Sequence, residues 1–219
     1  MLKKSGMQHR PLSGGFFIAR RRGGDKKAQK RKNALLSRKG LSLIEASVVL
    51  ALSAIVVSGV MYYYQAASDN NKTQSTVSEV MSIVSAVNGL CVGTSGYDGL
   101  DSEVIIKTSA VPENYKGTDG TTIMHPFGGE VEPGATNDGT KYYIVLNDVP
   151  QGPCVNLASM NFGTSLGGVG VGVPATTAAN GAVNTNGTGD GALTDKALTP
   201  AQASAACNED TNQIAFLLK

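Results

Sequence analysis

The longest hydrophobic run in the chain covers residues 41–64, and Glu45 is its only charged residue. It contains 24 residues. At about 1.5 Å per residue, a helix of this length matches the roughly 30 Å hydrocarbon core of a membrane. The run therefore predicts a membrane-spanning helix, for which we expect the segment 41–66.

Beyond this run the pattern becomes amphipathic, with apolar residues at the i, i+3, i+4, i+7 spacing of one helix face. These residues are Val77, Val80, Met81, Val84, Val87 and Leu90. The polar residues expected on the solvated face are Asp69, Asn70, Lys72, Gln74 and Glu79. One helix from residue 41 to about residue 90 is predicted, and its second part is expected to pack on a globular head of residues 67–219.

The pattern in the head predicts a small antiparallel sheet and an α+β fold class. Strands are expected at residues 103–107, 142–146 and 213–218, because these stretches are rich in β-branched or large apolar residues. Thr199 as a cap and Pro200 in the first turn predict a short helix that ends near Cys207.

Two long loops are also expected in the head. Residues 93–139 are rich in Gly, Asp, Thr and Pro, and residues 152–191 are rich in Gly. At the end of the second stretch, residues 176–192 are mostly Gly, Asn, Thr and Ala, a composition that buries little apolar surface. We therefore expect an exposed loop there.

Charge divides sharply at Gly40. Residues 1–40 contain 13 Lys or Arg and one acid, whereas residues 41–219 contain six Lys, 16 acids and no Arg. Basic residues before an apolar helix stay on the cytoplasmic side, so the C-terminal part is expected to cross the membrane. Nucleic-acid binding is the alternative for the basic run. The acidic remainder does not favour it, and no direct nucleic-acid site is predicted.

The residues at this boundary resemble the processing signature of type IV pilins. Gly40 is followed by Leu-Ser-Leu-Ile-Glu and a further hydrophobic run. In that family a prepilin peptidase cuts after the glycine, the new N-terminus is methylated, and the fifth mature residue is a glutamate. The resemblance implies that the basic leader 1–40 is removed, that the cut lies between Gly40 and Leu41, and that Leu41 is N-methylated.

The branch of the family is indicated by the leucine at the new N-terminus and by the long leader, which point to type IVb pilins. Residues 63–72, residues 125–129 and the two distal cysteines resemble bundle-forming pilins of enteric bacteria. The resemblance implies a type IV pilin fold: a long N-terminal helix, a small antiparallel sheet and a disulfide-closed C-terminal region.

The chain has three cysteines, Cys91, Cys154 and Cys207. A disulfide is expected in an exported chain. The resemblance implies that Cys154 and Cys207 form it. Cys91 is expected to be a small buried residue at the helix end, and an intermolecular or reactive role is the alternative.

Glu45 is the candidate docking residue. An acid within an apolar helix costs a few kcal/mol and is generally paired or functional. In the filament implied by the resemblance, Glu45 would neutralise the N-terminal amine of Leu41 on an adjacent subunit. The alternative is a glutamate that only lies at the headgroup level of the membrane.

Other chemistry has little support in the sequence. His9 and His125 are the only histidines, too few for a multi-histidine metal site, and no metal, cofactor or enzymatic activity is expected. The glycine run 167–172 lacks the Lys-Ser/Thr of a nucleotide loop. The loop residues Asp119, Asp138 and Asp190 lack a calcium-binding loop around them and are expected to be solvated.

The resemblance implies a major structural subunit, or prepilin, of a type IVb pilus that serves adhesion, aggregation or conjugative mating. The implied partners are other copies of the chain in a helical filament, the prepilin peptidase, an assembly ATPase, an inner-membrane platform protein and an outer-membrane secretin. The prepilin would lie in the bacterial inner membrane and the filament outside the cell. The alternatives are a type II secretion pseudopilin or minor pilin, and a solitary membrane-anchored binding domain.

Overall fold

The structure, a computed structural model, describes residues 42–219. The predictions for the leader 1–40, for the cut between Gly40 and Leu41 and for methylation of Leu41 concern residues outside this range. The chain divides into two units, residues 1–57 and 58–219.

Helix α2 (Leu43–Leu90) contributes to both units and confirms the predicted long helix. In residues 43–57 its large apolar side chains are exposed, as for Leu43 at 89% and Ile55 at 70%. Among the described residues, α2 alone is long and apolar enough to cross a membrane, judged by length and composition.

The buried face of α2 differs in part from the predicted one. Its buried residues are Thr76, Glu79, Val80, Ile83, Val84 and Val87. Met81 and Leu90 are instead 51% and 48% exposed, so their assignment to this face is wrong. Successive helical residues lie about 100° apart, which turns Met81 well away from a face that includes Val80 and Ile83.

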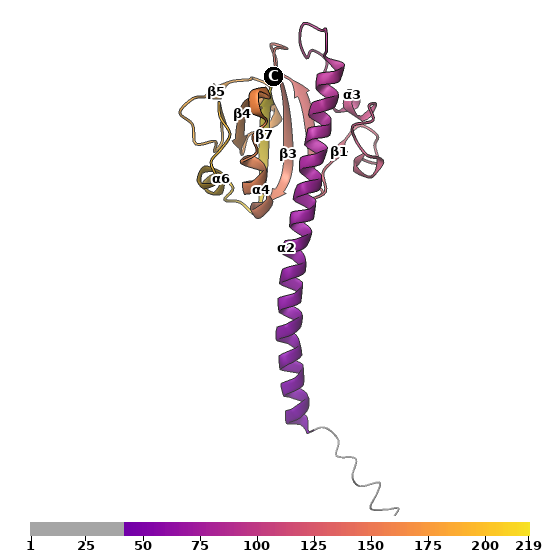
Figure 1. The fold of residues 1–219 in the computed structure, drawn as a ribbon, viewed down its shortest axis with the longest axis vertical. Helices are drawn as coiled ribbons and strands as arrows, with labels where there is room; N and C mark the ends of the chain where they lie inside the picture. Colours follow the sequence, from indigo (N-terminus) through magenta and orange to yellow (C-terminus); the bar gives the residue numbers. More distant parts are fainter. Residues whose placement is uncertain (1–41) are drawn as a thin grey trace, which may run out of the picture. The chain divides into compact units, whose positions relative to one another are not determined.

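The sheet lies in the unit of residues 58–219 and has seven strands in the order β1-β2-β3-β7-β4-β6-β5. They are β1 (Ile123–Met124), β2 (Glu130–Ala135), β3 (Tyr142–Pro150), β4 (Leu166–Val171), β5 (Val183–Asn184), β6 (Leu193–Thr194) and β7 (Thr211–Leu218). All neighbours pair antiparallel except β5 and β6. Figure 1 shows β7 between β3 and β4. The strands expected at 142–146 and 213–218 are confirmed.

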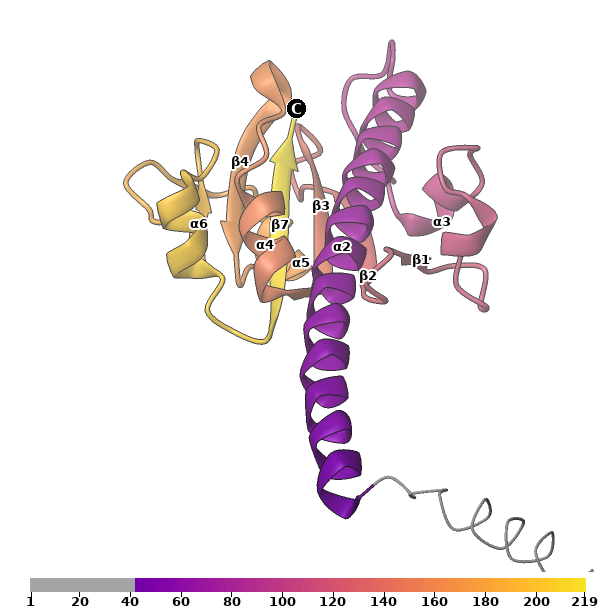
Figure 2. The ribbon, with the colours of Figure 1, turned by 60° about the horizontal axis from the view of Figure 1, so that its bottom comes forward.

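Both faces of the central strands are buried, which explains their nearly continuous apolar sequence. Ile144 and Phe216 belong to the core that also contains Ile83 of α2. Val145 and Leu217, the neighbours in sequence, belong to a second core on the other face. Alternate residues of a strand point to opposite faces. Figure 2 shows α2 and α4 (Gln151–Ala158) in front of the same face of the sheet.

The remaining helices are α3 (Ser102–Ile106), α5 (Ala175–Ala178) and α6 (Pro200–Ala206), with 3-10 turns η1 (Glu113–Tyr115) and η2 (Gly163–Ser165). Helix α6 is confirmed, and Thr199 forms a capping box with Gln202. The strand expected at 103–107 is wrong, because these residues form α3. The Asp101 carboxylate accepts the Val104 amide at 2.8 Å, and this cap starts a helix where the β-branched residues favoured a strand.

The two expected long loops are also wrong in part. Residues 93–139 contain α3, β1 and β2, and residues 152–191 contain most of α4 and all of β4. A Cβ on Gly168 would lie 2.8 Å from the Thr194 carbonyl oxygen, and one on Gly170 would collide with the Ala192 carbonyl. Glycines in β4 therefore admit a close neighbouring backbone rather than forming a loop.

Candidate functional site

The start of α2 shows how Glu45 is held. Its Oε2 accepts the backbone N–H of Ser42 at 3.2 Å, and Ser42 Oγ accepts the N–H of Ile44 at 3.4 Å. This resembles a Ser-x-x-Glu capping box, except that the serine reaches the second helical amide rather than the third. Sequence reasoning missed this cap, although the spacing of Ser42 and Glu45 was its signal. Both residues are exposed in the chain alone.

The predicted disulfide is confirmed between Cys154 and Cys207, with a sequence separation of 53 and a Cα–Cα distance of 6.0 Å. It joins α4 to the residue that follows α6, and both cysteines are fully buried. In the chain-entropy model a loop of this length is worth roughly 4 kcal/mol. Cys91 is a free thiol directly after α2 and is half-buried rather than buried.

Glu79 is the polar residue that the sequence placed wrongly. It was expected on the solvated face of α2, yet only 4% of it is exposed. Neither carboxyl oxygen has a hydrogen-bond partner among the described residues. Burial raises its pKa from 4.5 to about 8. A buried acid without a partner is uncommon, because its desolvation is left uncompensated.

The surroundings of Glu79 form a small pocket in the unit of residues 58–219. Its volume is about 220 Å³, and its walls include Ser75, Ser78 and Ser82 of α2 with Tyr115 opposite. The serines recur every three or four residues and so share a helix face. This periodicity was the available signal for a second, polar stripe on α2.

His125 and the loop aspartates serve local structure. His125 is buried, its Nδ1 accepts the Phe127 N–H at 3.2 Å, and its Nε2 lies 2.6 Å from the Asn147 carbonyl oxygen. Burial lowers the pKa of His125. The Asp119 carboxylate accepts the amides of Thr121 and Thr122, which lowers its pKa.

Asp138 also stabilises its own loop, because its carboxylate accepts a hydrogen bond from the Thr140 amide. Hydrogen bonds from the Thr136 side chain and the Thr140 backbone lower the pKa of Asp138 to about 2. Within residues 42–219 no group of three or more His, Cys, Asp or Glu side chains could hold a metal ion. The glycine run 167–172 lies mostly in β4, where its backbone pairs with β7 and β6.

Comparison with known proteins gives three findings. The family model for bundlin matches residues 65–215. Two relatives, from Escherichia coli O111:H- and from Escherichia coli O127:H6 (strain E2348/69 / EPEC), are both named "Major structural subunit of bundle-forming pilus". Each is 46% identical over 185 residues, which cover 83% of this chain and 94% of the relative. The crystal structure of TcpA, a type IV pilin from Vibrio cholerae El Tor biotype, aligns with a TM-score of 0.47 and 10% identity, covering 67% of this chain and 98% of that chain.

Proposed function

Because the chain belongs to the bundlin family of type IVb pilins, we propose that it is the major structural subunit of a surface pilus built from many copies of itself. The two relatives that carry this name match it over nearly their whole length. The chain would act by assembly rather than by catalysis.

The observation that carries the proposal is the uncovered apolar surface of α2 in residues 43–57. Leu43, Leu50 and Ile55 are 70% exposed or more in the isolated chain. Apolar surface left in water costs about 25 cal/mol per Å², so this helix needs a bilayer or other apolar helices around it. The segment 41–66 would lie in the inner membrane before assembly and in the core of a helical filament afterwards.

Glu45 would act between subunits. In the isolated chain its carboxylate accepts one amide of its own helix, which leaves acceptor capacity for a second donor. The proposed donor is the N-methylated amine of Leu41 on an adjacent subunit, which becomes available once the leader 1–40 is cut off after Gly40. In an apolar core both charges need this partner.

The proposal also includes the proteins that process, extract and export the subunit. A prepilin peptidase would remove the leader, an assembly ATPase and an inner-membrane platform protein would extract the subunit, and an outer-membrane secretin would pass the filament. The head, residues 67–219, would form the outer surface that serves adhesion, aggregation or conjugative mating.

The test is a cell in which this chain is the only pilin. We expect wild-type filaments whose subunits begin at N-methylated Leu41 in mass spectra. Glu45→Ala should be processed and stable in the membrane but give at least ten-fold fewer filaments or none, because breaking a buried charge pair costs about 3–5 kcal/mol. Glu45→Asp should retain partial assembly.

Electron microscopy of sheared surface fractions, beside an immunoblot of total pilin, measures the result. Glu103→Ala is the matched control, because this exposed acid lies in the head and its ion pair within residues 42–219 is with the exposed Lys107. Normal filament numbers with Glu45→Ala would refute its docking role. A wild-type chain that is made and processed but forms no filaments would refute the function itself.

A further inference from the structure

A groove follows α2 in the unit of residues 58–219, between the helix and the segment 108–126. Three adjoining pockets of about 410, 220 and 420 Å³ form it. The first two share Ser75 and Tyr115, and the last two share Ser82 and Ala110. The α2 residues that line it include Ser68, Asn71, Ser75, Ser78, Ser82 and Ser85. Small side chains at this spacing let another segment approach the helix closely.

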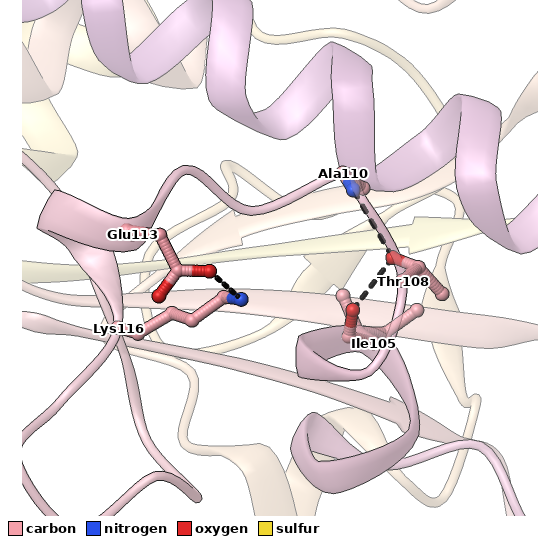
Figure 3. A network of polar contacts seen from close by, with 5 residues as sticks. All are labelled: Ile105, Thr108, Ala110, Glu113 and Lys116. Carbon is pink, nitrogen blue, oxygen red and sulfur yellow. Dashed lines mark hydrogen bonds and ion pairs between the residues drawn. The ribbon is translucent and has the colours of Figure 1, made fainter.

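The opposite wall of the groove is held by its own hydrogen bonds (Figure 3). The Thr108 hydroxyl donates to the Ile105 carbonyl at 2.6 Å and accepts the Ala110 amide at 3.2 Å. Glu113 pairs with Lys116 at 2.6 Å. The wall is therefore a formed structure beside α2 rather than a free loop.

Glu79 lines the central pocket of this groove, and neither of its carboxyl oxygens has a hydrogen-bond donor within residues 42–219. Three lysines lie in the groove or directly beside it in sequence, and each has another contact. Lys107 pairs with Glu103. Lys72 lies with its Nζ 5.7 Å from the centre of the Phe127 ring, and Lys116 bonds Glu113. The serine-lined wall of the groove is polar, and the buried Glu79 carboxyl has an uncompensated desolvation cost. A hydrogen-bond donor from another chain would offset this cost.

We propose that this groove binds a segment of a second copy of the chain, and that the Glu79 side chain, whose oxygens are shielded in the isolated chain, turns into the groove to accept a hydrogen bond from a lysine of this copy. The proposal rests on the filament proposed above, in which every subunit has identical neighbours. Residues 41–219 contain lysine but no arginine, so a side-chain cation from a neighbouring mature chain is a lysine. An ammonium group at the carboxyl favours its ionised form.

Two lysines suit this role. Lys196 and Lys219 are exposed, and neither forms an ion pair with a carboxylate within residues 42–219. Residues 41–219 carry ten more acids than lysines, so neighbouring heads repel one another. A specific lysine contact at each groove would offset part of this repulsion and set the register between heads.

Zero-length carbodiimide cross-linking tests the contact, because the reagent joins a carboxyl group to an amine that touches it. It is applied to purified wild-type filaments and to the same chain as a monomer in detergent. In filaments we expect covalent dimers in which the Glu79 peptide is joined to a lysine peptide, expected to contain Lys196 or Lys219. The monomer should show no such link.

Variants sharpen the test. Glu79→Gln should abolish the link and reduce filament yield several-fold, whereas Glu103→Gln, which alters an exposed acid, should preserve both. Because Glu79→Gln changes a buried residue, Lys196→Gln and Lys219→Gln provide a second route. These exposed positions leave the head folded, as an intact Cys154–Cys207 disulfide would show, and one of the two changes should remove the link.

Three results would overturn the proposal. One is a Glu79 link to Lys72 or Lys116 of the same chain, in monomer and filament alike. Another is abundant filaments with no Glu79 link and normal assembly of Glu79→Gln. The last is a failure of the wild-type chain to form filaments, which would remove the proposed function as well, whereas the first two leave that function standing.

Discussion

The two parts of helix α2 share a helical backbone but differ in the burial of their side chains. In residues 43–57 the large apolar side chains are exposed, and the acid, Glu45, is exposed and caps the first turn. In residues 76–87 one apolar face, with Val80, Ile83, Val84 and Val87, is buried. The acid there, Glu79, is buried without a partner among the described residues. The helical conformation alone therefore does not determine which side chains are buried. Burial depends on what packs against each face of the helix. The second part packs on apolar residues of the head, whereas the large apolar side chains of the first part are exposed within residues 42–219.

The largest expected effect comes from making the same change in both parts. Ile83→Ala should cost the head about 2–5 kcal/mol of unfolding free energy, because Ile83 is fully buried and its loss leaves a cavity. Ile55→Ala, at a 70% exposed position, should change the stability of the head by no more than about 0.5 kcal/mol.

Thermal and urea unfolding of the full chain in detergent, followed through the near-ultraviolet signal of the head, measures both changes. An equal loss at the two positions would mean that the two parts of α2 are one energetic unit, and the comparison would break down.

A smaller effect should follow pH at Glu79. Its folded pKa of about 8 lies above the ordinary value of 4.5, so folding favours the protonated carboxyl. This contribution is present in full below about pH 4.5 and is lost as the pH rises through about 8. Between these limits, the stability of the wild-type head should fall relative to Glu79→Gln by at most about 1.4 kcal/mol per pH unit.

Denaturant titrations of the full chain at several pH values, taken as the difference between the two proteins, measure this loss. The subtraction removes the contributions of the other titrating groups, including His125. A difference that does not change with pH would show that Glu79 is solvated in the chain alone.

The smallest expected effect on head stability is the difference between truncating Met81 and truncating Val80, which are adjacent in α2. Met81→Ala should change head stability by about 0.5 kcal/mol or less, because Met81 is half exposed. Val80→Ala should cost on the order of 2 kcal/mol, since Val80 is buried in the core. The same unfolding measurements compare the two. Equal costs at both positions would restore the predicted face, which contained both Val80 and Met81.

Much of the fold was predictable because its signals are local. The apolar run and its amphipathic continuation predict α2, the apolar stretches predict β3 and β7, and Thr199 with Pro200 predicts α6. The failures have two causes. In α3 two local signals compete, and the Asp101 cap decides over the β-branched residues. In β4 the deciding contacts come from the backbones of Ala192 and Thr194, which lie more than twenty residues away in sequence.

The candidate site divides in the same way. Glu45 was found from a motif of contiguous residues, and the Cys154–Cys207 disulfide was implied by a resemblance and confirmed in the structure. Glu79 could not be found, because a polar residue beside an apolar stripe is solvated or buried according to what covers it. Here the cover is the segment around Ala110 and Tyr115, and helical periodicity contains no information about its position.

The position of β7 in the sheet also has a consequence for folding in the proposed export route. In the proposed route the head would be delivered from its N-terminal side, yet β7, the last strand in sequence, pairs with both β3 and β4 at the centre. Without residues 211–218, β7 is missing from between β3 and β4. The part of the sheet that contains β1, β2 and β3 is then not connected to the part that contains β4, β5 and β6. Before that pairing, β3 and β4 each present an unpaired strand edge, and such edges are prone to aggregation.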